Sequence, residues 1–242
     1  MDPKFYYPIK PHVLTQGWGT LNPEVYSQFG FTRHNGLDHK LAPDNKIYAP
    51  CNGIIVKRAF QPNGGGIFVG MITGESDFPA FQNTTPDNAI VDFPALKARV
   101  LIDFLHCQNI LVNEGDIVVK GQLIAIGDNT GFSTGPHCHT QWRRVSWDGK
   151  VINTLDINDA NNSFDPTQFF NGKYAADLSP FLKDFGFGSI GQDIVHLQKI
   201  LNVTPIGIFG PLTRSAVKGF QVAHNIPETG FVGPLTRKVL NG

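Results

Sequence analysis

The first two thirds of this chain is organised around the stretch Gly131-Phe132-Ser133-Thr134-Gly135-Pro136-His137-Cys138-His139. The Gly and Pro that precede the histidines are typical of a tight turn, which would direct a following strand. Side chains at positions i and i+2 of a strand lie on one face, so His137 and His139 would reach the same cleft if residues 140–142 continue the strand. Cys138 would then point to the opposite face. Two imidazoles held side by side suit a metal ligand beside a general base, although a His-x-His pair alone is equally compatible with two partly exposed histidines on an edge strand.

The composition is that of a globular chain with many turns. With 41% hydrophobic and 17% charged residues, the 242 residues are enough for one or two domains with a sizeable core. The 26 glycines and 17 prolines favour short strands over long helices. Lysine and arginine (20) balance aspartate and glutamate (20), so the net charge gives no electrostatic reason to expect binding to nucleic acid or to an anionic membrane.

The cysteines and the N-terminal residues indicate the cellular compartment in which the chain is made. Cys51, Cys107 and Cys138 cannot form a complete disulfide set and include no Cys-x-x-Cys pair, so we expect reduced, buried thiols. Residues 1–8 lack the apolar core of a signal peptide, and no apolar run is long enough to cross a bilayer. We therefore expect synthesis in the cytoplasm and no membrane insertion.

Short apolar alternations separated by Gly, Pro, Asn and Asp run from Pro11 to about Phe170. This pattern predicts short β-strands, and no segment within it has a convincing helical period. We expect a mostly antiparallel β-sheet domain over residues 1–170, with strands at 47–49, 53–56, 67–72, 100–105 and 123–126.

Two insertions interrupt this pattern. Residues 73–99 are rich in Pro, Phe and Asp, and residues 146–163 are rich in Asn and Asp. Long loops on a β scaffold usually form either functional rims or mobile segments, and we favour rims.

A change of pattern marks a second domain after a connector over residues 171–188. Ile194, Leu197 and Leu201 lie on one helical stripe. The chain then repeats the pentapeptide Gly-Pro-Leu-Thr-Arg, with glycine at the N-cap and proline at the first helical position; the copies are residues 210–214 and 233–237. We therefore predict an α+β multidomain chain that ends in a small three-helix bundle over residues 189–242. Its inward stripes would be Leu212, Ala216, Val217 and Phe220, and Leu235, Val239 and Leu240.

A second pair of metal-binding residue types, His34 and Asp38, lies in the first domain. The intervening Asn-Gly indicates a turn into a strand, which can bring both side chains to one ion. Together with one member of the His137 and His139 pair they supply two nitrogens and one oxygen. Three protein ligands that leave one position for water are the pattern of a catalytic zinc site.

Such a site also needs a base. Bound zinc would lower the pKa of a water molecule towards ~7 and polarise a peptide carbonyl. The chain has no His-Glu-x-x-His motif, so the remaining candidates are His106 and the unliganded member of the His137 and His139 pair. A cysteine nucleophile is disfavoured, because strand alternation places the sulfur of Cys138 away from both neighbouring imidazoles.

An ordered set of motifs in the first domain resembles a known family. Over residues 11–170 the chain closely resembles the lysostaphin-type zinc endopeptidases, which cut peptidoglycan peptides. The motifs are Gln16-Gly17-Trp18-Gly19, His34-Asn35-Gly36-Leu37-Asp38, Ala49-Pro50-Cys51-Asn52-Gly53, Leu105-His106, Glu114-Gly115-Asp116-Ile117-Val118-Val119-Lys120-Gly121-Gln122, and Gly127-Asp128-Asn129-Thr130-Gly131 to His139.

This resemblance implies zinc as cofactor, with His34, Asp38 and His139 as ligands. It implies that His106 and His137 form a catalytic pair that activates water and steadies the oxyanion. Two features depart from the family pattern: Cys107 and Cys138 replace bulkier apolar residues, and the insertion over residues 73–99 is longer than compact members need.

Residues 189–242 resemble the three-helix peptidoglycan-binding domain found on many wall hydrolases, most specifically over Gly207 to Gln221. The combined expectation is a monomeric zinc metalloendopeptidase that acts on the peptide cross-links or stem peptides of bacterial peptidoglycan and is tethered to the wall. The missing leader would fit a phage-type lysin, released through a separate membrane pore or carried by the virion. The alternatives are a catalytically inactive wall-binding scaffold or hydrolase activator, and a carbohydrate-binding virion protein without hydrolytic activity.

Overall fold

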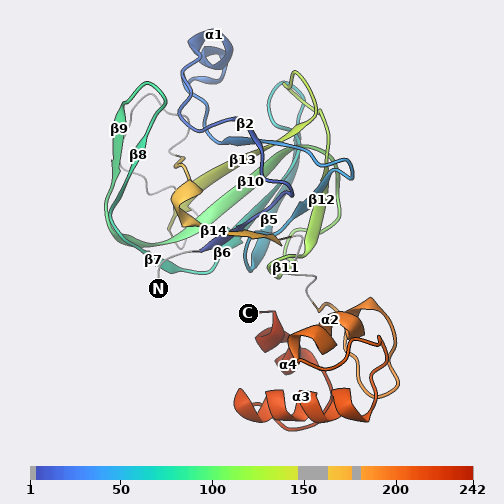
Figure 1. Ribbon diagram of the computed structural model, residues 1–242. Coiled ribbons are helices and arrows are strands. Elements are labelled where there is room, and N and C mark those ends of the chain that lie inside the picture. Colours follow the sequence, from blue (N-terminus) through green and yellow to red (C-terminus); the bar gives the residue numbers. More distant parts are fainter. Residues whose placement is uncertain (1–3, 147–162, 176–180, 242) are drawn as a thin grey trace. The chain divides into compact units, whose positions relative to one another are not determined.

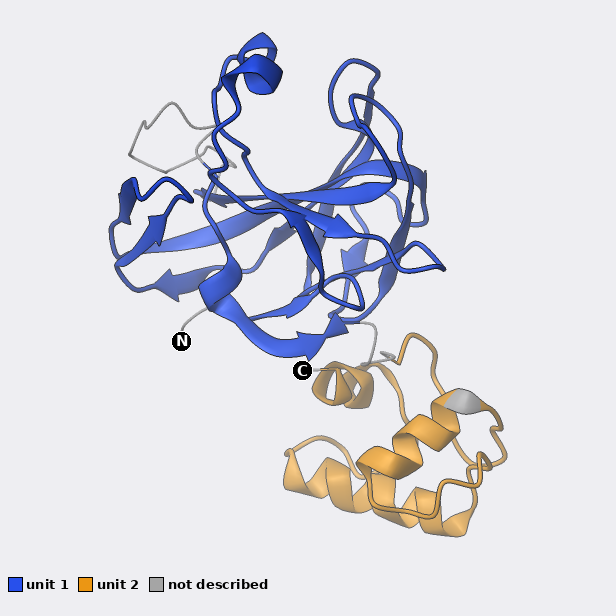
Figure 2. Cartoon of the chain, turned by 45° about the horizontal axis from the view of Figure 1, so that its top comes forward, with its two compact units in different colours: residues 1–177 blue, residues 178–242 orange. Residues whose placement is uncertain are grey.

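A computed structural model describes residues 4–146, 163–175 and 181–241 (Figure 1). The chain divides into two compact units, residues 1–177 and 178–242, which are coloured separately in Figure 2. The borders proposed above, 1–170, 171–188 and 189–242, stay a prediction.

Unit 1 consists almost entirely of short strands. They are β1 (Phe5–Tyr7), β2 (Leu14–Gln16), β3 (Leu37–Lys40), β4 (Lys46–Tyr48), β5 (Gly53–Gln61), β6 (Gly66–Thr73), β7 (Ser76–Phe78), β8 (Phe81–Thr84), β9 (Ile90–Phe93), β10 (Leu96–Ile110), β11 (Ile117–Val118), β12 (Leu123–Gly127), β13 (His137–Val145) and β14 (Phe170–Tyr174). The main sheet has the order β11-β5-β6-β10-β13-β3-β2, and β12 pairs with β10 and β4 (Figure 1). Its pairings are antiparallel, whereas β1 and β14 pair in parallel. The predicted β fold is confirmed, and each predicted strand overlaps an observed one.

The long strand β10 is the centre of this sheet. Its Ile102 lies opposite Met71 of β6 and Trp142 of β13, and all three side chains are fully buried. Beyond Phe104 the register shifts, and β10 continues in a ladder with β12. His106 lies within this irregularity, and register shifts of this kind locally bend a strand.

Unit 1 also contains one short helix, in a region where the sequence has no convincing helical period. It is α1 (Pro23–Tyr26), followed by a 3₁₀ turn at Ser27–Phe29. The Asn22 side chain accepts a hydrogen bond from the Val25 N–H, and proline occupies the first turn, so local capping stabilises the helix. One turn is too short to produce a helical period in the sequence.

The first insertion forms β7, β8, β9 and the start of β10, and none of its described residues lines the cleft that contains the candidate site. Its phenylalanines instead face inward: Phe81 and Phe93 are stacked with ring centroids 4.6 Å apart, and both rings contact Phe164. The expectation of a cleft rim is therefore wrong for residues 73–99, because burial of these rings holds the hairpin against the sheet. The expected rim over residues 146–163 lies almost wholly outside the described residues.

Unit 2 contains α2 (Gln192–Ile200), α3 (Pro211–Ala223) and α4 (Pro234–Leu240). The two Gly-Pro repeats begin α3 and α4 as predicted, with Gly210 and Gly233 as N-caps. The apolar core comprises Phe181, Phe185, Ile194, Leu197, Phe209, Val217 and Val232.

The inward stripe predicted for the two repeats is partly wrong. Leu212 and Leu235 are 75% and 57% exposed, whereas Thr213 and Thr236 are buried. The reason is a duplicated polar arrangement in which a buried glutamine of one helix donates to the threonine that opens the next. Gln198 Nε2 lies 2.9 Å from Thr213 Oγ1, and Gln221 Nε2 lies 2.9 Å from Thr236 Oγ1. Within the described part of the chain, no helix is both long and apolar enough to cross a membrane.

Candidate metal centre

Two neighbouring strands bring the predicted ligands together. Asp38 is in β3 and His139 is in β13, and the register places these two residues opposite each other. His34 lies in the loop that leads into β3. Gly36 lies in the turn between His34 and the start of β3. A Cβ atom at this position would be 2.6 Å from His139 Nε2 and would overlap the Thr140 carbonyl oxygen. The Asn-Gly turn therefore lets the loop pass directly over the His139 ring.

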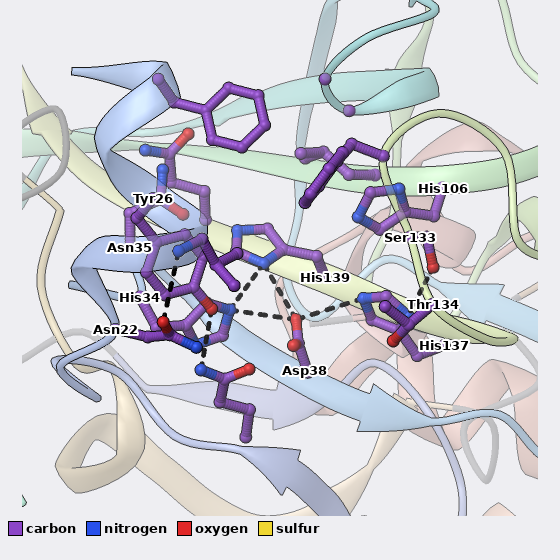
Figure 3. A pocket seen from close by; sticks show the side chains of 18 of the residues that line it. Asn22, Tyr26, His34, Asn35, Asp38, His106, Ser133, Thr134, His137 and His139 are labelled. Atoms are coloured by element: carbon purple, nitrogen blue, oxygen red, sulfur yellow. Dashed lines mark hydrogen bonds and ion pairs between the residues drawn. The ribbon is translucent and has the colours of Figure 1, made fainter. Parts of the chain in front are cut away.

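The three side chains converge on one point (Figure 3). His34 Nε2 lies 3.1 Å from Asp38 Oδ1 and 3.0 Å from His139 Nδ1, and His139 Nδ1 lies 2.9 Å from Asp38 Oδ1. Donor atoms around a tetrahedral zinc ion with bonds of about 2.0–2.1 Å are roughly 3.3 Å apart, so the observed triangle is close to that spacing. Among the described residues this trio forms a group whose ligand atoms all lie within 4.8 Å of one another.

The charge of Asp38 and the tautomer of His34 also suit a cation. Burial alone would raise the pKa of Asp38, but hydrogen bonds with His137, His139 and His34 hold the pKa far below its usual range, so the carboxylate is ionised. The His34 Nδ1 lies 2.9 Å from the Gly17 carbonyl oxygen. Because a carbonyl only accepts, Nδ1 carries the proton and Nε2 presents its lone pair to the site. Two nitrogens and one carboxylate oxygen therefore fit zinc.

His106 and His137 lie beside the trio. Their ring centroids are 4.6 Å apart, and His137 Nε2 is 3.4 Å from Asp38 Oδ1. Each ring donates Nδ1–H to a carbonyl at 2.8 Å, that of Thr130 for His106 and that of Gly135 for His137. A neutral ring held in this way has its Nε2 atom as an acceptor. Burial would lower the pKa of His137, but the hydrogen bond and charge of Asp38 raise it overall. Burial lowers the pKa of His106 to about 4, which keeps that ring neutral at neutral pH.

The backbone of His106 is unusual and explains how the ring reaches the site. Its φ of 63° lies in the left-handed region, which is uncommon for a residue with a side chain. The conformation is held from both sides, because the His106 N–H donates to the Gly65 carbonyl at 2.8 Å and the His106 carbonyl accepts from Asp128 N–H at 2.9 Å. The Gly-rich turn near Gly65 therefore positions a candidate catalytic residue.

A cleft of about 470 Å³ contains all five of these residues. Its walls carry aromatic side chains that sequence reasoning did not assign to the site: Tyr26, Phe29, Phe31 and Phe132. Phe29 and Phe132 meet edge to face with centroids 5.2 Å apart, so the α1 loop and the loop before β13 contact each other beside the cleft. No spacing in the sequence links these loops, because they are joined only by the fold.

The cysteines do not take part in this site. Cys138 is fully buried and its side chain lies on the face of β13 opposite His137 and His139, as alternation predicted. Burial raises the pKa of Cys107 to about 12 and that of Cys138 well above its usual value. Both are neutral thiols, which disfavours a cysteine nucleophile.

Comparison with known proteins gives two family matches. Residues 95–154 match the profile of peptidase family M23, and residues 181–240 match a putative peptidoglycan binding domain. The chain carries a peptidase family M23 domain and a peptidoglycan-binding domain. Peptidases of family M23 are zinc metalloproteases, so zinc is the cofactor of the M23 domain.

Several curated relatives support this assignment. An uncharacterized metalloprotease of Haemophilus influenzae is 28% identical over 51% of this chain and 21% of its own length. Lysostaphin of Staphylococcus simulans is 25% identical over 66% of this chain and 24% of its own length. The peptidoglycan DD-endopeptidase ShyA of Vibrio cholerae is 26% identical over 52% of this chain and 23% of its own length. The chain thus spans about a quarter of the length of these relatives.

Solved structures that align with part of this chain include the catalytic domain of lysostaphin from Staphylococcus simulans, at 23% identity and a TM-score of 0.43 over 65% of this chain and 91% of that one. A zinc containing peptidase from Vibrio cholerae aligns at 23% identity and a TM-score of 0.42, over 59% of this chain and 37% of that one.

Replacement of Gly36 by alanine tests the close approach above His139. The added Cβ would overlap the Thr140 carbonyl and the His139 ring, so we expect zinc affinity to fall at least about 10-fold, as when groups that orient a ligand are disturbed. Gly74→Ala is the control, because a Cβ at Gly74 would meet no atom within 4 Å. Zinc affinity is measured by competition with a chelator, and equal affinity of the two variants would contradict the role of Gly36.

Proposed function

We propose that this chain is a peptidoglycan hydrolase that cuts peptide bonds of the bacterial cell wall with zinc-activated water. The observation that carries the proposal is the convergence of His34, Asp38 and His139 on one point, with the Nε2 atoms of His106 and His137 beside it (Figure 3). Three ligands suit a catalytic ion better than a structural one, which usually has four.

Each residue has a distinct task in this proposal. His34, Asp38 and His139 would hold the ion, which would act as a Lewis acid that lowers the pKa of water and polarises the scissile carbonyl. His106 and His137 form the proton-handling pair: one ring accepts the proton of the attacking water at Nε2, and the other, in its protonated form, donates an Nε2–H hydrogen bond to the developing oxyanion. Their Nδ1–H groups are already engaged with carbonyls, so both rings are oriented before the substrate arrives.

We further propose that unit 2 is a three-helix wall-binding module. Its match to a peptidoglycan-binding domain supports this role, and the duplicated glutamine–threonine arrangement fixes the loops between the helices. Tethering would raise the local concentration of cross-linked peptide at the cleft. A catalytically inactive scaffold or activator would bind walls equally well, but it would have no need for a complete ligand set with an adjacent histidine pair.

Product analysis tests the hydrolase proposal. Purified cell walls incubated with the zinc-loaded protein should release fragments with new amino termini inside the peptide and intact glycan strands, as identified by mass spectrometry. Full wall binding without new termini would support the scaffold, and new reducing sugars would overturn the peptidase assignment. Walls with different cross-links in the same assay identify the bond, whether in a cross-bridge or in a stem peptide.

The remaining expectations concern the whole protein. A phage-type, bacteriolytic lysin should clear suspensions of susceptible cells when added from outside, which turbidity measurements test. Sedimentation of the purified protein tests the expected monomer. Both stay predictions of the sequence.

A further inference from the structure

The tip of the β8–β9 hairpin is a preformed tight loop that presents one carboxylate. The Thr85 N–H donates to the Ala89 carbonyl at 2.9 Å, and Thr85 Oγ1 accepts from the Ala89 N–H at 2.9 Å. The same hydroxyl lies 2.7 Å from Asp87 Oδ1. Contacts within the loop therefore fix the position of the Asp87 carboxylate, independently of its contacts with other segments.

Asp87 forms a two-point ion pair with Arg33, the residue directly before the ligand His34. Arg33 Nη1 donates to Asp87 Oδ1 at 2.6 Å, and Arg33 Nη2 donates to Asp87 Oδ2 at 2.8 Å. The Arg33 side chain is only 13% exposed. Paired donation of this kind fixes the plane and the position of a guanidinium group, which a single ion contact does not.

The guanidinium also joins the two segments that carry the first ligand. Arg33 Nη1 donates to the Gly19 carbonyl at 3.0 Å. The Gly19 N–H donates to the His34 carbonyl at 2.8 Å, and the His34 N–H donates to the Thr20 carbonyl at 2.8 Å. The Gly17 carbonyl, two residues before Gly19, accepts the hydrogen bond from His34 Nδ1–H. The position of residues 17–20 thus decides both the tautomer and the direction of the His34 ring.

The hairpin tip also packs directly against the segment that holds His34. Gly19 has a φ of 75°, and a Cβ at this position would lie 2.8 Å from the Thr85 methyl group. The loop is anchored independently on its other side, because Trp18 Nε1 donates to Ser163 Oγ at 2.9 Å and Trp18 is buried. Loss of the Asp87 contact should therefore loosen the Gly19 segment without unfolding it.

We propose that Asp87 is a positioning residue for the metal centre: through Arg33 it holds the Gly17–Thr20 segment against His34 and so raises the affinity of the site for zinc. This inference depends on the proposed zinc-binding role of His34, Asp38 and His139. It gives the insertion over residues 73–99 a task at the site although none of its described residues lines the cleft.

The test compares Asp87→Asn with Asp92→Asn in the full chain. Asp92 lies on the same hairpin and pairs with Gln82 at 2.7 Å, so both variants change the charge equally but only Asp87→Asn removes the two-point ion pair with Arg33. Zinc dissociation constants are measured by chelator competition below the unfolding temperature. We expect Asp87→Asn to bind zinc about 10-fold more weakly than the unsubstituted chain, which is the smallest loss of affinity typical when a group that orients a metal ligand is removed. We expect Asp92→Asn to bind zinc with unchanged affinity.

Three further measurements separate positioning from general destabilisation. Arg33→Lys, which keeps the charge but loses the planar fork, should weaken zinc binding as Asp87→Asn does. Asp87→Glu, which keeps a carboxylate on the loop, should retain more affinity than Asp87→Asn. Peptide hydrolysis by Asp87→Asn should recover when zinc is added in excess, because the cleft itself is unchanged.

The outcomes distinguish this inference from the proposed function. If the unsubstituted chain binds no zinc, the proposed function fails first. If it binds zinc and Asp87→Asn binds with the same affinity, or if Asp92→Asn is weakened equally, Asp87 does not position the centre and only the present inference is overturned.

Discussion

The His139→Ala variant is expected to lose zinc and, with it, all peptide hydrolysis. His139 Nδ1 is 2.9 Å from Asp38 Oδ1 and 3.0 Å from His34 Nε2, and its ring is almost fully buried. Without it two protein ligands remain, fewer than the three of a catalytic zinc site, and alanine leaves a cavity where the ring was. Elemental analysis should fall from about one zinc per chain to near zero, and fragment release from walls should match that of a sample without protein.

A matched control is needed because His139 is a core residue of β13. His12→Phe also removes one imidazole from unit 1 but keeps an aromatic ring against Tyr7, which stacks on His12 at 3.9 Å. This variant should keep its zinc and its activity. Circular dichroism of both variants checks the fold. A folded His139→Ala protein that still holds one zinc ion and cuts walls would rule out the ligand set proposed above.

His106→Ala and His137→Ala are expected to lower kcat by about 10²–10⁴-fold while zinc stays bound, because they remove proton transfer and oxyanion stabilisation rather than a ligand. Neither ring occupies a corner of the triangle formed by His34, Asp38 and His139. The combination of full zinc content and lost turnover is the distinguishing result. Steady-state kinetics on a soluble cross-linked peptide, with zinc measured in the same samples, provides it.

The double variant sharpens this test. Residues that act as one unit give strongly non-additive effects, so His106→Ala with His137→Ala together should be only slightly slower than the worse single variant. Fully additive losses would indicate two independent contributions instead of a pair. Loss of zinc in either single variant would reassign that histidine to the ligand set.

Much of the fold was predictable because it depends on local patterns. Alternating apolar residues identified the strands that became β4, β5, β6, β10 and β12, and the Gly-Pro repeats identified the starts of α3 and α4. The exceptions were elements held by contacts that leave no period: α1 is fixed by the Asn22 cap, and Leu212 turns outward because the neighbouring Thr213 is paired with Gln198. The insertion over residues 73–99 was misread because its phenylalanines meet partners from residues 164–169, far along the chain.

The sequence by itself determined which residue types meet at the centre: the Asn-Gly turn after His34 and the His-x-His strand both follow from backbone geometry over a few residues. It did not determine, without the family resemblance, which imidazole of that strand joins Asp38. The pairing of β3 with β13 decided this, since it sets His139 opposite Asp38 and His137 opposite Lys40. Register between strands about a hundred positions apart is fixed by burial of the whole sheet. The left-handed backbone of His106, which directs its ring to the site, is held by hydrogen bonds to Gly65 and Asp128 in other segments of the chain. Only tertiary structure could decide these two features, because their energies come from contacts that no short stretch of sequence contains.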